Sequence, residues 1–146
     1  MRRAVCTGSF DPVTVGHVDI FERAAAIFDE VLACIFINRK KQYFFSLEER
    51  LKFLSLSTTH LPNVRVDHFE GLVTDYMRSV EANVIVRGLR STADFDHEFR
   101  EAQMIKRLKA VPDGMTRNGQ HMRTVDPVLS GDVILLHLPE NCGHTP

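Results

Sequence analysis

The sequence predicts an α/β fold, with a Rossmann-like doubly wound parallel sheet in a single domain and an atypical C-terminal tail. Short apolar runs alternate with amphipathic helical patterns in the order βαβαβαβα, which is typical of a parallel sheet with right-handed crossovers. Two of the runs, 31–37 and 84–86, are continuously apolar, as expected of strands buried on both faces. The 146 residues, 44% of them hydrophobic, suffice for one domain with a sizeable core.

The first strand, residues 3–7, leads into a turn that carries glycine, hydroxyl and histidine side chains. The turn reads Thr7-Gly8-Ser9-Phe10-Asp11-Pro12-Val13-Thr14-Val15-Gly16-His17. A helix is predicted over 17–28, because apolar residues recur there at helical spacing. Backbone N–H groups and the positive end of such a helix bind phosphates in α/β folds. The turn therefore indicates a nucleoside triphosphate site in which His17 donates to phosphate oxygens. An ordinary βα turn with a surface histidine is the alternative.

The middle of the chain continues the alternation of strands and helices. A buried strand over 31–37 leads into a basic loop, 38–42. A capping box, Ser46-Leu47-Glu48-Glu49, then opens a helix that runs to about residue 58. The next two elements are a strand near a sheet edge, 64–69, and a helix, 71–80.

The last elements of the predicted core are one strand and one helix. Residues 84–86 form a buried strand that ends at Arg87-Gly88-Leu89-Arg90. Ser91-Thr92-Ala93-Asp94 caps a helix with the apolar face Phe95, Phe99, Ala102, Ile105 and Leu108. After residue 108 the pattern weakens, and only 133–138 has the character of a regular element. We therefore divide the chain into a core, 1–108, and a divergent segment of uncertain fold, 109–146.

Three polar clusters follow strands of this sheet, at the edge where α/β folds bind their ligands. They are the turn 7–17, the loop 38–42 and the turn 87–90. In the loop, Lys41 and the two cations before it suit a second phosphate, with a solvated basic loop as the alternative. Arg87 and Arg90 also suit phosphate recognition, with pairing to nearby acidic residues as the alternative.

Composition and charge exclude several classes of function. A net charge of −1 gives no electrostatic case for binding nucleic acid or a membrane surface. No apolar run approaches the ~20 residues that cross a bilayer, and no signal peptide is expected. Cys6 and Cys34 lie in strand-like runs, as buried thiols of a reducing cytoplasm do. Metal-ligand spacing is lacking at His60, His68, His97, His121, His137 and His144.

At its polar clusters the chain resembles the phosphopantetheine adenylyltransferases, nucleotidyltransferases of coenzyme A biosynthesis. The resemblance covers about residues 1–108. Its motifs are Gly8-Ser9-Phe10-Asp11-Pro12-x-Thr14-x-Gly16-His17, Lys41 before Phe45-Ser46-Leu47-Glu48-Glu49-Arg50, and Arg87-Gly88-Leu89-Arg90-x-x-x-Asp94-Phe95-x-x-Glu98. The first motif alone indicates the superfamily. The three together favour this family over the cytidylyltransferases and the nicotinamide-nucleotide enzymes.

The resemblance implies an enzyme that transfers the adenylyl group of ATP to 4′-phosphopantetheine, giving dephospho-coenzyme A and pyrophosphate with Mg²⁺ as cofactor. In such an enzyme the acceptor phosphate attacks the α-phosphorus of ATP directly. The resemblance also implies a cytoplasmic homohexamer that needs neither nucleic acid nor membrane. A non-catalytic remnant that still binds phosphopantetheine or coenzyme A is the alternative. A nucleotidyltransferase for another phosphorylated acceptor is a weaker one.

The resemblance further implies roles for individual residues. The catalytic residues would be His17, Lys41 and Arg90. Those that contact ATP would be Ser9, Phe10, His17, Gly88, Leu89, Arg90 and Glu98. Those that bind phosphopantetheine would be Ser9, Lys41, Val73 and Arg87. No residue is implied as a ligand of the metal ion.

The tail departs from the family pattern. Family members continue with a strand and a turn of the form Ile-Ser-Ser-Ser, which cradles the ATP phosphates. Residues 109–146 contain no such turn, and Ser130 is the only serine after position 91. Loss of the fifth strand and its turn would weaken ATP binding and expose core, and loss of the tail would also damage the hexamer.

Overall fold

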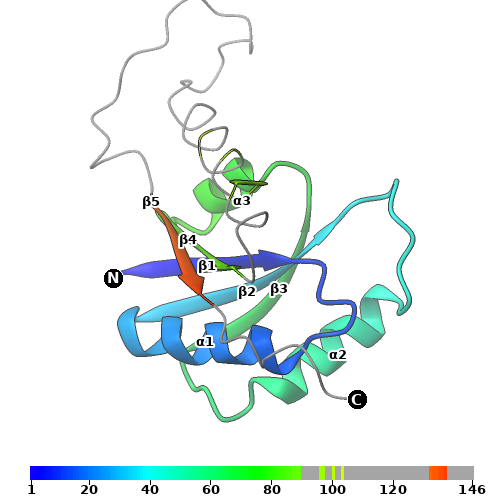
Figure 1. Ribbon diagram of the computed structural model, residues 1–146, viewed down its shortest axis with the longest axis horizontal. Coiled ribbons are helices and arrows are strands. Elements are labelled where there is room, and N and C mark those ends of the chain that lie inside the picture. Colours follow the sequence, from blue (N-terminus) through cyan, green and yellow to red (C-terminus); the bar gives the residue numbers. More distant parts are fainter. Residues whose placement is uncertain (90–95, 98–99, 101–102, 104–131, 138–146) are drawn as a thin grey trace, which may run out of the picture.

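The computed structural model of the chain describes residues 1–89, 96–97, 100, 103 and 132–137. Five parallel strands form one sheet in the order β3-β2-β1-β4-β5. The strands are β1 (Arg3–Gly8), β2 (Glu30–Ile37), β3 (Val64–Glu70), β4 (Val84–Leu89) and β5 (Asp132–His137). The helices are α1 (Val15–Ile27), α2 (Leu47–Ser57) and α3 (Val73–Ser79). In Figure 1, α1 and α2 lie on one side of the sheet and α3 on the other, which confirms the doubly wound arrangement.

Several element boundaries differ from the prediction by one to three residues, including α3, which begins at Val73 instead of residue 71, and two of the differences have reasons visible in the backbone. Helix α1 begins at Val15 instead of residue 17, because the Thr14 side chain caps it. Strand β4 runs to Leu89 instead of ending at residue 86. Arg87, Gly88 and Leu89 pair with consecutive residues of β5, so they belong to the strand and not to a turn.

The fifth strand of the sheet is present. Strand β5 pairs in parallel with the whole of β4, from Val84–Asp132 to Leu89–His137. The apolar run 133–138 was the signal for it. The boundary between core and divergent segment at residues 108–109 falls outside the described residues. So does the apolar face predicted for the helix after β4, of which Asp96, His97, Arg100 and Gln103 are described as helical and exposed.

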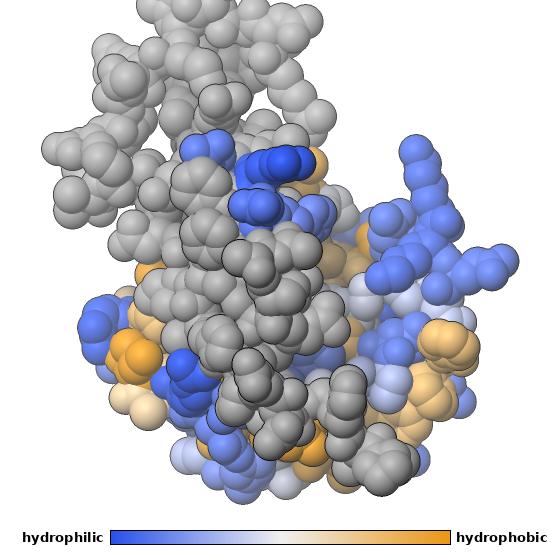
Figure 2. All heavy atoms as spheres, in the orientation of Figure 1, coloured by the Kyte–Doolittle hydropathy of each residue, from blue (hydrophilic) through white to orange (hydrophobic). Residues whose placement is uncertain are grey.

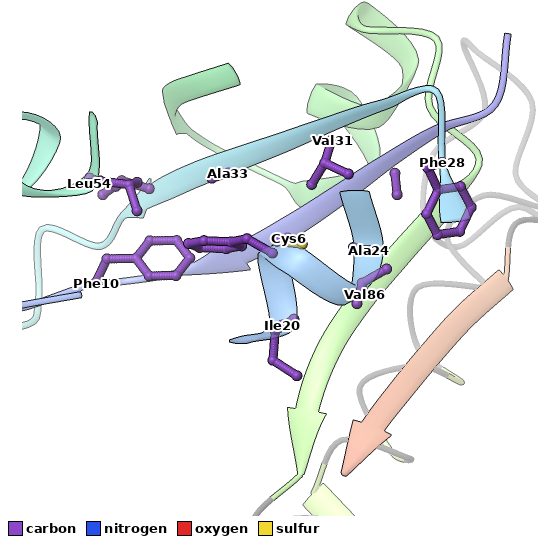
Figure 3. Close-up of a cluster of buried hydrophobic side chains, with 12 residues drawn as sticks. Cys6, Phe10, Ile20, Ala24, Phe28, Val31, Ala33, Leu54 and Val86 are labelled. Atoms are coloured by element: carbon purple, nitrogen blue, oxygen red, sulfur yellow. The ribbon is translucent and has the colours of Figure 1, made fainter. Parts of the chain in front are cut away.

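The larger of two apolar cores lies between the sheet and helices α1 and α2 (Figure 3). Strand β2 contributes to both cores, because its residues from Val31 to Ile35 are all buried and alternate between the two faces. The helices contribute Ile20, Phe21 and Ala24 from α1 and Leu54 from α2. This packing fixes α1, and hence the turn before it, against the carboxyl end of β1.

A second core lies under α3 on the opposite face of the sheet. Tyr76 and Met77 of α3 pack there against Leu32 and other residues of the three central strands. The Tyr76 hydroxyl donates to Asp67 at 2.9 Å, so the polar end of this buried ring is satisfied.

Both described cysteines are buried free thiols, as the sequence predicts. Cys6 faces the α1 core and Cys34 the α3 core. Burial raises the pKa of each thiol to about 12, because the thiolate loses its hydration there. Neither is therefore a nucleophile at neutral pH. Cys142 lies outside the described residues.

Replacing Cys6 by alanine should make stability less sensitive to alkaline pH. The folded protein holds this proton up to about pH 12, whereas the unfolded chain releases it near the ordinary value of 9.0. The contribution of the thiol is therefore complete below pH 9 and is lost as the pH rises toward 12. Between pH 8 and pH 10, the wild-type free energy of unfolding should fall by about 1 kcal/mol more than that of Cys6→Ala. Urea unfolding at each pH measures this free energy. An equal fall in wild type and Cys6→Ala would contradict the burial of this thiol.

Candidate functional site

The candidate site lies at the carboxyl end of β1, where the chain leaves the centre of the sheet. From β1 the order continues to β2 and β3 on one side and to β4 and β5 on the other. Ligands of doubly wound sheets bind at such a switch point. The turn after β1 and the loop after β2 both begin at this edge, and in Figure 1 the loop projects beyond the sheet. Figure 2 shows the projecting segment as strongly hydrophilic.

His17 is held in a defined orientation by the first turn of α1. The backbone N–H of Thr14 donates to His17 Nδ1 at 2.9 Å, and the Thr14 hydroxyl accepts from the His17 N–H at 3.4 Å. The pair is a capping box in which histidine takes the place of glutamate. Because Nδ1 is an acceptor, the neutral ring carries its proton on Nε2. His17 is thus preorganised to donate from Nε2 to an anion.

Phe10 shapes the turn from inside the core. Its ring is 4% exposed and packs edge-on against His17, with ring centroids 4.9 Å apart. The residue has a φ of +46°, which is uncommon for a bulky side chain. A Cβ on Gly8 would lie 3.1 Å from the Phe10 ring, so a larger residue there would crowd this ring. Because the ring is buried, only the backbone of Phe10 is placed to contact a ligand, and its predicted contact with ATP stays a prediction.

Ser9 and Lys41 meet in the structure although 32 residues separate them in the sequence. Lys41 Nζ lies 3.2 Å from Ser9 Oγ. Asp11 ties the two segments together, because its carboxylate oxygens accept the N–H groups of Phe44 at 2.7 Å and Phe45 at 2.9 Å. The turn after β1 and the basic loop therefore lie at the same edge of the sheet, as predicted.

The three adjacent cations of the loop do not act together. Arg39 forms an ion pair with Glu70 at the end of β3. Lys40 is exposed, and its backbone N–H donates to Asn38. Lys41 alone of the three is placed beside the turn after β1.

Two of the predicted phosphopantetheine residues lie toward the α3 face of the sheet. Arg87 follows Ile85 by two positions in β4, so it shares the face of the α3 core, and it donates to the Thr7 hydroxyl at 2.5 Å. Val73, at the start of α3, packs against the same core. The predicted residues therefore divide between the two faces, with Ser9 and Lys41 at the edge that joins them.

The remaining predicted residues belong to β4 or lie beyond it. Gly88 and Leu89 are in the strand, where their backbone pairs with β5. Arg90 and Glu98 lie outside the described residues, so their predicted roles stay predictions.

Sequence reasoning missed Arg50 and gave Tyr43 and Asp11 no role. Arg50, on α2, is 3% exposed, donates to the Ser9 carbonyl at 3.1 Å and stacks on the Tyr43 ring. A signal was present, because Arg50 precedes the buried Leu54 by four positions and so falls on the inward face of α2. A charged residue on an apolar face marks a position that packing alone does not explain.

The described residues provide no protein cage for a metal ion. No three histidine, cysteine, aspartate or glutamate side chains gather to form one in the part of the chain that the structure describes. The carboxylate of Asp11, beside the turn, already accepts two backbone N–H groups. Within the same part of the chain, no helix is long and apolar enough to span a membrane.

Comparison with known proteins places this geometry in a wider group. Residues 5–136 match the cytidylyltransferase-like family profile. The phosphopantetheine adenylyltransferase of Shouchella clausii (strain KSM-K16) is 55% identical over 108 residues, which are 74% of this chain and 68% of that protein. Among solved structures, a lipopolysaccharide core biosynthesis protein from Thermoplasma volcanium GSS1 superposes with a TM-score of 0.56. It is 20% identical, with 95% of this chain and 97% of that chain covered, and shares the fold.

Proposed function

The chain belongs to the cytidylyltransferase-like family and, within it, to the phosphopantetheine adenylyltransferases, and from this premise we propose that it adenylylates 4′-phosphopantetheine. ATP is the donor, and the products are dephospho-coenzyme A and pyrophosphate. The observation that carries the proposal is the meeting of Ser9 with Lys41 beside the helix start that holds His17. One hydroxyl, one ammonium group and one oriented imidazole near the start of α1 support the proposal that phosphates bind there.

The reaction needs positioning and charge neutralisation rather than a protein nucleophile. An oxygen of the acceptor phosphate forms a bond to the α-phosphorus of ATP, and the bond from that phosphorus to the pyrophosphate oxygen breaks. His17 donates from Nε2 to an oxygen that gains charge as this happens. Lys41 and Arg87 hold the acceptor phosphate, with Ser9 between the two substrates. Arg90 and Glu98 complete the nucleotide site in this proposal.

Mg²⁺ is part of the proposal as a companion of ATP. The described residues provide no cage for it, and magnesium commonly binds through substrate phosphates and water with few protein ligands. In this proposal the ion would be held mainly by the phosphate oxygens of ATP, where it would neutralise their charge. We also propose that the enzyme works in the cytoplasm as a homohexamer, which rests on the family resemblance.

Strand β5 and the stretch after it bear on whether the chain is an enzyme or a binding remnant. It reads Leu138-Pro139-Glu140-Asn141-Cys142, without the serines of the family turn. Strand β5 is nevertheless in place and ends beside Leu89 of β4. The strand that leads into the family's phosphate turn is thus kept, which supports the enzyme.

Purified protein should release pyrophosphate from Mg-ATP only when 4′-phosphopantetheine is present. A coupled pyrophosphate assay measures the release. A folded protein that binds 4′-phosphopantetheine in calorimetry and releases no pyrophosphate would be a binding remnant. Pyrophosphate release with another phosphorylated acceptor, and none with 4′-phosphopantetheine, would show that the proposed substrate is wrong.

His17→Ala should lower kcat by roughly 10²- to 10³-fold, the usual cost of removing one preorganised donor to a charged transition state. Binding of ATP, measured by calorimetry, should change little, because the donor acts as charge develops. His60→Ala is the matched control, since His60 is half-exposed and pairs with Glu22 on the surface. Unchanged turnover in His17→Ala would remove this residue from the mechanism.

Lys41→Ala should raise the KM for 4′-phosphopantetheine by roughly tenfold or more, because a charged hydrogen bond to the acceptor phosphate is lost. Lys40→Ala, which removes the same charge one position earlier, should leave this KM unchanged. Steady-state kinetics with each substrate varied in turn separate the effects. A loss confined to the KM for ATP would move Lys41 to the nucleotide side.

A further inference from the structure

Arg50 is a buried cation that no described carboxylate neutralises. Its side chain is 3% exposed, and none of the ion pairs among the described residues includes it. Its Nε atom is buried without a hydrogen-bond partner there. Burying a guanidinium group in this way opposes folding, because hydration is lost and incompletely replaced. An apolar side chain would fill the same position at lower cost, so stability alone does not account for the arginine.

The contacts of Arg50 reach both segments that meet at the site. Its Nη1 atom donates to the carbonyl of Ser9 at 3.1 Å, which fixes the turn after β1 from beneath. Its guanidinium lies 3.9 Å from the centre of the Tyr43 ring, in the loop after β2. That loop carries Lys41, whose Nζ lies 5.8 Å from the same ring and 3.2 Å from Ser9 Oγ.

Through Tyr43, the contact with Arg50 also restrains the rest of the loop after β2. Its hydroxyl accepts the backbone N–H of Asn38 at 2.9 Å. The Tyr43 side chain therefore links the first residue of the loop to Arg50 in the first turn of α2. The ring is half-buried, and a stacked guanidinium stabilises it through cation–π attraction. Asp11 holds the other end of the loop through the N–H groups of Phe44 and Phe45.

We propose that Arg50 is a positioning residue for adenylyl transfer, an inference that rests on the proposed function. From beneath, it clamps the Ser9 turn and the Tyr43 ring together, so that Lys41 is held over Ser9. Its charge, which is weakly screened because it is buried, adds to the attraction of the site for phosphate. The clamp explains why an arginine occupies the inward face of α2.

Limited proteolysis tests the clamp without any substrate. Trypsin cleaves after Arg39, Lys40 and Lys41, which all lie in the loop. In Arg50→Met this cleavage should be roughly tenfold faster than in wild type, because the stacking that restrains Tyr43 is gone. Tyr43→Leu should do the same, and the double variant should be cleaved no faster than either single variant. Lys52→Met, which removes a charge from the exposed face of α2, should keep the wild-type rate.

Kinetics test the consequence of the clamp for the reaction. Arg50→Met should raise the KM for 4′-phosphopantetheine more than it lowers kcat, as Lys41→Ala does. Because the clamp acts through Lys41, adding Arg50→Met to Lys41→Ala should raise this KM by a smaller factor than Arg50→Met does alone, and the remaining factor is the effect of the Arg50 charge. Arg50→Lys keeps the charge and loses the stacked plane. It should partly restore the KM for 4′-phosphopantetheine, while the loop stays sensitive to trypsin.

The outcomes separate this inference from the proposed function. Wild-type cleavage and KM in Arg50→Met would overturn the clamp. Faster cleavage throughout the chain, with a lowered thermal midpoint, would also overturn it in favour of a merely structural role. A wild-type protein that transfers no adenylyl group, yet whose loop needs Arg50 for protection, would overturn the proposed function and support the clamp.

Discussion

The site depends on one topological constraint, the central position of β1 between two parallel neighbours. With β2 on one side and β4 on the other, the carboxyl end of β1 is the place from which the chain winds in both directions. Helix α1 must start there, and its first turn offers N–H groups to whatever binds. The buried central strands hold this point in place. The short segments that follow each strand are therefore fixed relative to one another.

In the turn after β1 and the loop after β2, the same hydrogen bonds stabilise the local structure and orient the residues of the site. The bond from the Thr14 N–H to His17 Nδ1 caps α1 and also decides which ring nitrogen carries the proton. The Asp11 carboxylate closes the loop and also brings Lys41 to the turn. A residue of the first motif therefore rarely has a single purpose. Phe10 is a further case, since its buried ring supports His17 on one side and leaves little room for a residue larger than Gly8 on the other.

The sequence predicted the sheet, its helices and the placement of the turn 7–17 and the loop 38–42 at one sheet edge, because hydrophobic periodicity and strand order can be read from short stretches of sequence. It predicted the capping box at Ser46 for the same reason. It did not predict that β4 extends through Arg87 to Leu89, since that extension depends on pairing with β5, far along the chain. Nor did it find the role of Arg50, which depends on the Ser9 carbonyl and the Tyr43 ring lying above one position of α2. Contacts between distant segments leave little trace in local patterns.

The anchoring of the loop by Asp11 has an entropic consequence. Between β2 and α2 the chain must cross open solvent, and ordering a free backbone costs roughly 1–2 kcal/mol per residue. Because Asp11 fixes the backbone at Phe44 and Phe45, part of this cost is met when the protein folds. A substrate that arrives at Lys41 then has fewer residues left to order. A looser loop would lose conformational entropy when the substrate binds. Here that entropy is already lost on folding, so the contacts with the substrate yield a higher affinity.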